Sequence, residues 1–460
     1  MTAKLIKFVE DLRASYWFVP MCMTIGALLL AIGARALDAS ALTENVPNLR
    51  WLQALGADDA RAILNVVASG VLGVAGVTFS ITIVAVSFAS SNFGPRLIGN
   101  FMRDRGSQYT LGTFIGTFVY SLFILSNVHA SSTSTDGAEI AEFVPHLSIL
   151  LALLLMLASI AVLIFFIHHI AETINIENII ATIGLKLKQR INDVYPSPEP
   201  SDDLLSADFT HLIEGKELHC IDANCIGYVQ AINHEKLAEV AASNDVLISV
   251  HYRPGDFVSS HDCMMSVWRE HTQTVAADEL RQCFVTGQQR TEHQNILFLV
   301  EQLGEVVARA LSPGVSDPFT AISCLNWYRT ALFEYLAAQK DQTDDHQWHR
   351  RRIQLLPISF QRLTSVMFER TRQYIASDTN VVLHTLALLT ECAAYAGPGS
   401  HQQVLKTHLE NVQQAAIETL GDSIETRLVS RRFSEAKQII STGLPAGLDK
   451  QQCDWFGGSA

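Results

Sequence analysis

Charge is nearly absent from the longest apolar runs of this chain. Four such runs cover Tyr16 to Leu37, Ile63 to Ala89, Tyr109 to Val128 and Leu147 to Ile170, and no Asp, Glu, Lys or Arg lies in the middle of any of them. Each run is about as long as the ~20 residues that a helix needs to cross a bilayer. Proton relays and voltage sensors usually place ionisable residues inside such spans, so their absence argues against a pump or a voltage-gated channel. A passive pore remains compatible with the pattern.

The motifs of common catalytic and metal sites are also absent. None of the eight cysteines forms a C-x-x-C pair, so we expect scattered reduced thiols and no bound metal. The chain has no P-loop, no Rossmann glycine pattern, no G-x-S-x-G and no H-E-x-x-H, and we therefore expect no cofactor and no enzyme activity. An enzyme would have to gather four polar residues that are close only in sequence: Arg290, Glu292, His293 and Asp317.

The distribution of charge and the length of the chain indicate several separate parts. The apolar excess precedes residue 171, most of the charge follows it, and the net charge of −13 argues against a nucleic-acid surface. We predict a membrane α-helical fold, a four-helix transmembrane bundle, followed by a cytosolic α/β module and an α-helical domain. The predicted parts are the transmembrane domain (1–170), a helical stalk and Pro-rich linker (171–200), the α/β module (201–275), the helical domain (276–445) and a C-terminal tail (446–460).

The positions of basic residues predict the orientation of the membrane helices. Nine lie before the first run, between the second and third, or after the fourth: Lys4, Lys7, Arg13, Arg96, Arg103, Arg105, Lys186, Lys188 and Arg190. The other two loops hold three: Arg35, Arg50 and Arg61. The positive-inside rule then predicts a multi-pass protein of the bacterial inner membrane, with the lipid bilayer around it and both termini in the cytoplasm.

Small and hydroxyl residues distinguish the second and third runs from the other two. The candidates are Gly73, Gly76, Thr78, Ser80 and Thr82 in the second run, and Gly112, Thr113, Gly116, Thr117 and Ser121 in the third. Small residues let helices approach closely, and hydroxyls hydrogen-bond across the contact, so packing within or between subunits explains them. The alternative is a hydroxyl-lined pathway through a homo-oligomer.

The end of the fourth run predicts a helix that continues beyond the membrane. His168 and Glu172 share a helix face there and fit either a polar membrane anchor or a pH-sensitive or metal site. Apolar residues then recur at helical spacing, which predicts an amphipathic stalk that packs against a partner. They are Ile176, Ile179, Ile180, Ile183 and Leu187.

Beyond the linker, strand and turn signals give way to helices. We predict strands over 225–232, 246–252, 257–258 and 263–268, a helix over 234–242, and a long amphipathic helix through 296–311. The run Arg309 to Ala321 reads as a helix stop, a tight turn and a new helix, with Asp317 as N-cap and Pro318 at the first helical position. The candidate cytosolic motif comprises Arg290, Ser312, Pro313, Gly314, Asp317 and Pro318.

Three segments resemble one bacterial family. The run 309–321 (RALSPGVSDPFTA) is similar to the hallmark of the DUF2254 family of predicted inner-membrane proteins, although Ser316 stands where the hallmark has Asn. The segments 77–82 with 93–97, and 227–230 with 253–256, match it as well. The resemblance covers nearly the whole chain; it implies a membrane location and transfers no catalytic residue.

Two functions fit these observations. The first, narrowly favoured by the hydroxyl residues, is a homo-oligomeric channel or transport protein for an unidentified ion or small ligand, gated by the cytosolic region. The second is a membrane-anchored cytosolic scaffold or sensor with no transport pathway. Tight packing of Thr78, Thr82, Thr113 and Thr117 between helices, with no continuous cavity, would argue against the first.

Overall fold

A computed structural model describes most of the chain. The described residues are 15–39, 56–94, 96, 101, 104–129, 132–133, 139–140, 143–194, 213–269, 277–292, 294–338, 349–350, 352–356 and 358–442. The predicted Pro-rich linker at 195–200 and tail at 446–460 lie outside them, as do His293 and the basic residues Lys4, Lys7, Arg13, Arg50 and Arg103. The chain forms two compact units: Lys7–Asn175, called here the N-terminal unit, and Ile176–Ala460 with Met1–Ile6, called the C-terminal unit.

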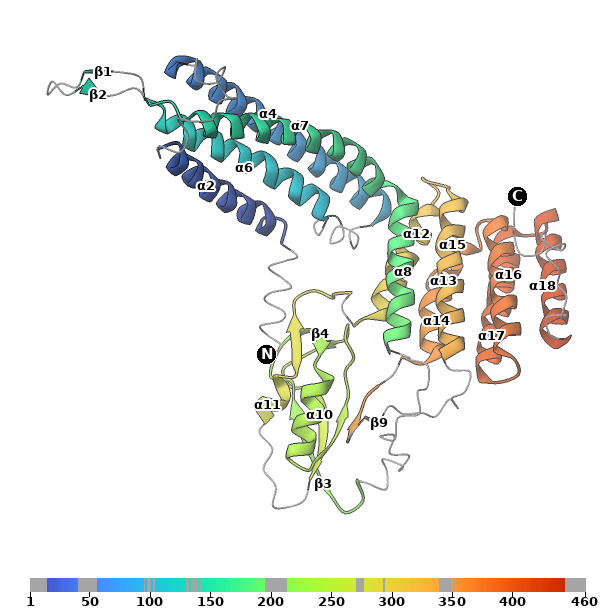
Figure 1. Cartoon of the computed structure of the whole chain (residues 1–460). Coiled ribbons are helices and arrows are strands. Elements are labelled where there is room, and N and C mark those ends of the chain that lie inside the picture. Colours follow the sequence, from blue (N-terminus) through green and yellow to red (C-terminus); the bar gives the residue numbers. More distant parts are fainter. Residues whose placement is uncertain are drawn as a thin grey trace. The chain divides into compact units, whose positions relative to one another are not determined.

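The N-terminal unit contains the predicted apolar helices. They are α2 (Phe18–Asp38), α4 (Ala57–Phe93), α6 (Arg105–Asn127) and α7 (His146–Ile174), and they lie side by side (Figure 1). Among the described residues, these four are long and apolar enough to cross a membrane, which confirms the positions predicted from the sequence. A short hairpin of β1 (Ser132–Thr133) and β2 (Glu139–Ile140) pairs between α6 and α7.

Helix α6 contacts each of the other three helices. One apolar cluster joins α6 to α2, α4 and α7 around Tyr120, Ile124 and Leu64, all fully buried. A second cluster packs Phe114 of α6 against Val67 and other residues of α4. The buried residues of the N-terminal unit therefore gather around α6.

The end of α2 is tied to the start of α7 by one carboxylate. Asp38 Oδ1 accepts a hydrogen bond from the Leu147 amide at 2.9 Å, and Oδ2 accepts from the Ser148 amide at 2.9 Å and from Ser148 Oγ at 2.6 Å. These amides belong to the first turn of α7, whose N–H groups have no partner within their own helix. Asp38 thus caps α7 although it is distant in sequence.

The predicted continuous stalk is interrupted by one residue. Asn175 has extended backbone angles (φ −64°, ψ 121°), so α7 ends at Ile174 and α8 (Ile176–Val194) begins as a separate helix. The apolar face of α8 packs on α12 (Ile296–Ala310) and α13 (Pro318–Ala338) of the same chain, and Ile180 and Ile183 are fully buried there. The partner of this amphipathic helix lies within its own unit.

The strands of the C-terminal unit form two sheets. The larger has the order β3-β7-β5-β10-β9, with β10 parallel to β5 and the other pairs antiparallel; the smaller has the order β6-β4-β8. The strands and helices are β3 (Glu217–Asp222), β4 (Gly227–Ile232), α10 (His234–Ser243), β5 (Leu247–Val250), β6 (Phe257–Val258), β7 (Cys263–Arg269), α11 (Ala277–Arg281), β8 (Phe284–Gly287), β9 (His349–Arg350) and β10 (Ile353–Gln354). The four strands predicted from the sequence correspond to β4, β5, β6 and β7, whereas β3, β8, β9 and β10 were not predicted.

One pair of cysteines departs from the prediction of reduced thiols. Cys220 on β3 and Cys263 on β7 form a disulfide, with their Cα atoms 5.7 Å apart. The antiparallel pairing of β3 with β7 brings these two cysteines together. They are 43 residues apart in the sequence, and no local pattern predicted the disulfide. Cys283, Cys324 and Cys392 are free and buried.

The remainder of the C-terminal unit is helical. It comprises α14 (Phe360–Phe368), α15 (Arg372–Ile375), α16 (Thr379–Ala396), α17 (Ser400–Leu420) and α18 (Ile424–Thr442). Helix α14 ends at Phe368, and the short helix α15 begins at Arg372. Asp317 caps α13 as predicted, because its carboxylate accepts from the Thr320 amide at 3.1 Å and from Thr320 Oγ1 at 2.6 Å.

Replacement of Asp38 tests the cap that joins α2 to α7. We expect Asp38→Ala to destabilise the protein by about 1–2 kcal/mol, since it leaves the first amides of α7 without an acceptor. Asp38→Asn, which keeps one acceptor oxygen, should lose less. The measurement is the thermal unfolding midpoint in lipid nanodiscs, and the exposed Asp59→Ala serves as control. Equal midpoints for Asp38→Ala and wild type would contradict the assignment.

Candidate functional site

The G-x-x-x-G pair of α6 lies in a contact within the chain. A Cβ added at Gly112 would lie 2.5 Å from Met23 Sδ and 3.2 Å from Pro20 Cα, and one at Gly116 would lie 3.3 Å from Ala27 Cβ. An added Cβ would force a shift at Gly112 and would make a tight contact at Gly116, so glycine allows α2 to approach closely at both positions. The pair therefore serves close packing between α6 and α2.

The hydroxyl candidates of α6 have different surroundings. Thr117 Oγ1 lies 3.2 Å from Ser159 Oγ of α7, and both side chains are buried. Thr113 is half-buried and donates to the Tyr109 carbonyl of its own helix at 2.9 Å. Ser121 is buried, and its hydroxyl has no partner among the described residues. The structure thus places this stripe between helices of one chain.

The candidates of α4 are divided between two opposite faces. Thr78 and Thr82 are buried, and Thr82 donates to the Thr78 carbonyl at 2.9 Å. Gly73, Gly76 and Ser80 are exposed, and an added Cβ at either glycine would meet nothing within 4 Å. At about 100° per residue, the two groups lie on opposite sides of the helix.

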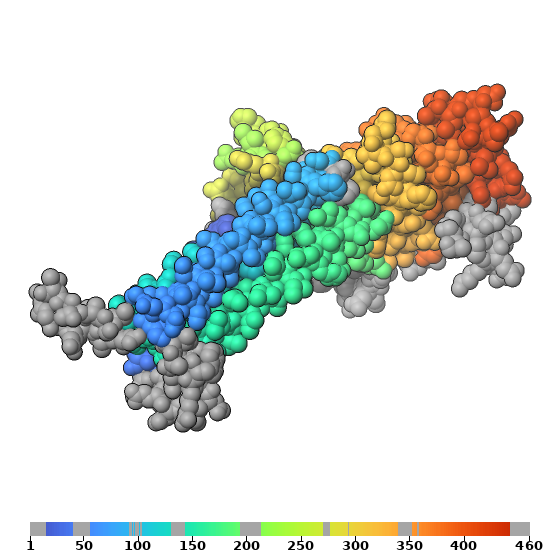
Figure 2. Space-filling model, turned by 90° about the horizontal axis from the view of Figure 1, so that it is seen from above, coloured from blue at the N-terminus to red at the C-terminus, as the bar shows by residue number. Residues whose placement is uncertain are grey.

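The exposed candidates belong to a longer row, called here the outer stripe of α4. Its members are small or polar, they recur every three or four residues, and Ile83 and Val84 interrupt it once. They are Asn65, Ser69, Gly73, Gly76, Ser80, Ser87 and Ser91, all exposed. Figure 2 shows α4 (blue) uncovered along one face of the unit, beside α7 (green). The outward faces of α2 and α7 carry instead large apolar residues such as Leu29 and Ile164.

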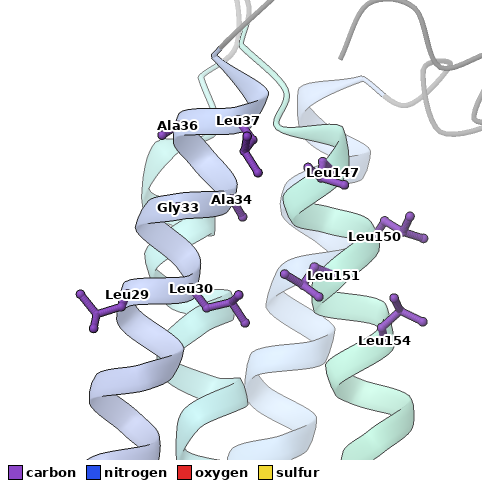
Figure 3. Close-up of a pocket in the computed structure, with 10 residues that line it drawn as sticks. All are labelled: Leu29, Leu30, Gly33, Ala34, Ala36, Leu37, Leu147, Leu150, Leu151 and Leu154. Atoms are coloured by element: carbon purple, nitrogen blue, oxygen red, sulfur yellow. The ribbon is translucent and has the colours of Figure 1, made fainter. Parts of the chain in front are cut away.

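A groove between α2 and α7 has a different character. Its lining is wholly aliphatic or glycine (Figure 3). The residues are Leu29, Leu30, Gly33, Ala34, Ala36 and Leu37 of α2, and Leu147, Leu150, Leu151 and Leu154 of α7. Because no polar group is present to orient a polar solute, the groove suits an acyl chain rather than a polar ligand.

A hydrogen-bonded pair, Asp104 and His169, joins the start of α6 to the end of α7. Asp104 accepts from the Ser107 amide at 2.8 Å as the N-cap of α6, and both of its carboxylate oxygens lie 2.9 Å from His169 Nε2. Burial raises the pKa of Asp104, but the hydrogen bonds from Ser107 and His169 outweigh it and leave the pKa below its ordinary value. A Cβ at Gly106 would overlap the His169 ring. The sequence analysis named His168 and not His169. The contact of His168 with Glu172 is exposed to solvent.

A buried carboxylate of α12 pairs with two arginines. Glu301 is buried; its Oε2 accepts from Arg290 Nη1 at 2.6 Å, and its Oε1 accepts from Arg370 Nη1 at 2.7 Å. Arg290 Nε is buried with no partner among the described residues. The sequence singled out Arg290 but not Glu301, since the ion pairs depend on a residue 11 positions away and another 69 away.

The rest of the cytosolic motif forms the α12–α13 loop (311–317). The Ser312 carbonyl accepts from the amides of Val315 and Ser316, each at 3.0 Å, and the Asp317 amide donates to the Ala310 carbonyl at 2.8 Å. Ser316 has a φ of +50°, a conformation in which Asn is favoured among non-glycine residues. Pro313 and Gly314 are exposed. The motif therefore sets a helix stop and restart.

The structure does not bring the two parts of the cytosolic motif together. Arg290 precedes α12 and Asp317 follows it, so the 15 residues of that helix, about 22 Å of rise, separate them. Glu292 is paired instead with Lys186 of α8 at 3.1 Å. Among the described residues, no three His, Cys, Asp or Glu side chains are placed to hold a metal ion.

Comparison with known proteins identifies the family of this chain. The family model described as a predicted membrane protein, DUF2254, matches residues 13–391. The chain belongs to the DUF2254 family. Uncharacterized proteins of Mycobacterium bovis and Mycobacterium tuberculosis (strain H37Rv) are each 28% identical over 390 residues, which cover 83% of this chain and 73% of theirs. No solved structure matches.

Replacement of Glu301 tests the buried ion pairs of this DUF2254 protein. Glu301→Gln removes the charge that both arginines face, and we expect a loss of about 1–3 kcal/mol in stability, because the guanidinium of Arg290 would stay partly buried. The measurement is the thermal unfolding midpoint of the full chain. Glu410→Gln, in an exposed pair with Lys437, is the matched control and should leave the midpoint unchanged. Equal losses of stability for Glu301→Gln and Glu410→Gln would contradict the assignment of buried ion pairs at Glu301.

Proposed function

We propose that the protein is a homo-oligomer whose subunits meet along the outer stripe of α4 and enclose there a narrow, uncharged pathway for a small ion or polar solute. One observation carries the proposal: the small and polar side of α4 faces away from α2, α6 and α7. In this proposal the four helices form a transmembrane bundle in a bacterial inner membrane, with both termini in the cytoplasm, and the C-terminal unit regulates the pathway.

The chemistry of the bilayer supports a protein neighbour for this stripe. Acyl chains offer no hydrogen bonds, so hydroxyl and amide groups that face lipid are unfavourable. Helices α2 and α7 differ from α4 in this respect, because their exposed large residues are mainly leucine and isoleucine and their described residues include no row of exposed hydroxyl groups. A second α4 would replace lipid at the stripe, and the open space beside Gly73 and Gly76 would allow its backbone to approach closely.

The stripe is also suited to a weakly polar pathway. Ser69 Oγ donates to the Asn65 carbonyl at 2.6 Å, and Ser91 Oγ donates to the Ser87 carbonyl at 2.9 Å. These hydroxyl oxygens therefore retain lone pairs that accept hydrogen bonds or contact a cation. No charged residue lies between Asn65 and Ser91, so the pathway would be passive.

The second candidate function is a membrane-anchored scaffold or sensor with no pathway. The packing of Gly112, Gly116 and Thr117 against neighbouring helices favours it, since these residues are accounted for within one chain. Under this alternative the outer stripe of α4 would serve only as a dry contact between subunits.

Bulky substitutions in the stripe test the proposal. We expect Gly73→Leu with Gly76→Leu to weaken the oligomer and to lower K⁺ flux from liposomes about tenfold or more, since overpacking a tight contact costs about 1–3 kcal/mol. Leu157→Phe with Ile164→Phe, at sites 59% and 67% exposed, adds bulk to the apolar outward face of α7 and is the control.

Two measurements separate the candidate functions. Native mass spectrometry reports the oligomeric state, and flux reports the pathway. An oligomer that requires Gly73 and Gly76 but shows no flux above empty liposomes would favour the scaffold. A double variant that keeps both the wild-type oligomer and its flux would exclude the outer stripe of α4 as the contact.

A further inference from the structure

The start of α13 and the loop before it present apolar side chains to solvent. Phe319 is 76% exposed and Val315 is 52% exposed. Backbone hydrogen bonds hold the shape of the loop that carries Val315. Asp317, the one charged residue of this loop, is the N-cap of α13, and Phe319 lies in the first turn of that helix. Single exposed apolar residues are common on protein surfaces. The position of these two residues in the fold therefore decides whether they indicate a contact surface.

These side chains lie at the end of the C-terminal unit where the chain arrives from α7. Helices α8 and α13 run parallel: Ser323 Oγ donates to Glu177 Oε1 at 3.1 Å in their first turns, and Lys188 Nζ lies 2.9 Å from Glu334 Oε1 further along. Only Asn175 separates α8 from α7, a candidate membrane span. The first turn of α13 is therefore fixed beside a segment that leaves the membrane region.

The position of Phe319 along α13 can be compared with the thickness of the lipid headgroup layer. Phe319 precedes Ser323 by four residues, so it lies about 6 Å nearer to the end of the unit than the contact with Glu177. The polar layer on each side of the hydrocarbon is about 5–8 Å thick. A side chain at this end, next to the exit of α7, is within reach of that layer.

A second apolar side chain is exposed at the same end. Helix α16 runs parallel to α13, since His384 Nε2 lies 2.8 Å from Asn326 Oδ1 and the rings of Phe333 and Tyr395 pack further along. Helix α17 returns antiparallel to α16, and the turn after it begins α18 at Ile424, which is 72% exposed.

We propose that this end of the C-terminal unit contacts the membrane interface, with Phe319 and Val315 inserted among the lipid headgroups of the leaflet from which α7 emerges. Aromatic and aliphatic side chains gain by transfer from water to this layer. The contact gives the hallmark run 309–321 a role, because this run carries both exposed apolar side chains. Asp317, already bonded to Thr320, adds no uncompensated charge to the contact.

Quenching by labelled lipid tests this contact in the full chain. Phe319→Cys carries an environment-sensitive fluorophore, in a background with Cys22→Ala and Cys453→Ala, and the protein is reconstituted in liposomes that contain headgroup-nitroxide phospholipid. Phe257→Cys is the matched control, because Phe257 is 52% exposed and Gly255, two residues before it, lies against Asn295 at the other end of α12. Background labelling is subtracted with the same chain lacking an introduced cysteine.

The expected result is a fluorescence loss of about twofold or more at position 319 and little loss at 257, since the interface layer is only several ångströms deep. Val315→Cys supplies a second site if Phe319→Cys does not fold. Absence of quenching at both 315 and 319, or equal quenching at 257, would overturn the proposal. A different result would assign the surface to a second copy of the chain. In that case the fluorophore at position 319 would show self-quenching that disappears on dilution with unlabelled subunits, and the labelled lipid would not quench it.

Discussion

Close approach between α6 and α2 is the contact on which the N-terminal unit depends. Gly112 and Gly116 remove the side chains that would hold the two helices apart, and α6 then lies against α2, α4 and α7 together. Tyr120 reaches the Ser148 carbonyl of α7 at 3.0 Å, and Thr117 meets Ser159. Because shape and uncharged hydrogen bonds hold these helices, their central segments need no ion pair.

The C-terminal unit depends on a different kind of contact. Helix α8 is amphipathic, and its isoleucines need a covering surface once the chain has left the apolar helices. Helices α12 and α13 supply this surface, and Lys186 and Lys188 add ion pairs at its edge. The segment that follows α7 is thereby part of a folded unit rather than a free tether.

The surfaces that remain uncovered carry the functional argument. The outer stripe of α4 carries small and polar residues where α2 and α7 carry large apolar ones, and Phe319 is an exposed aromatic side chain; these two observations are the basis of the proposed neighbours. The proposed neighbours differ because the two surfaces lie in different surroundings. One is on a helix able to span the bilayer, whereas the other is beside the point where the chain leaves α7.

The sequence by itself determined the features that depend on neighbouring residues. The four apolar helices, the strands β4 to β7 and the N-cap of Asp317 all follow from local composition and spacing. Only the tertiary structure decided which small residues are covered, because the rotation of a helix about its axis depends on the helices it meets. Gly112 and Gly73 look alike in the sequence, yet one lies under α2 and the other faces outward. The same applies to the partners of Asp38, Asp104 and Glu301, which come from distant parts of the chain.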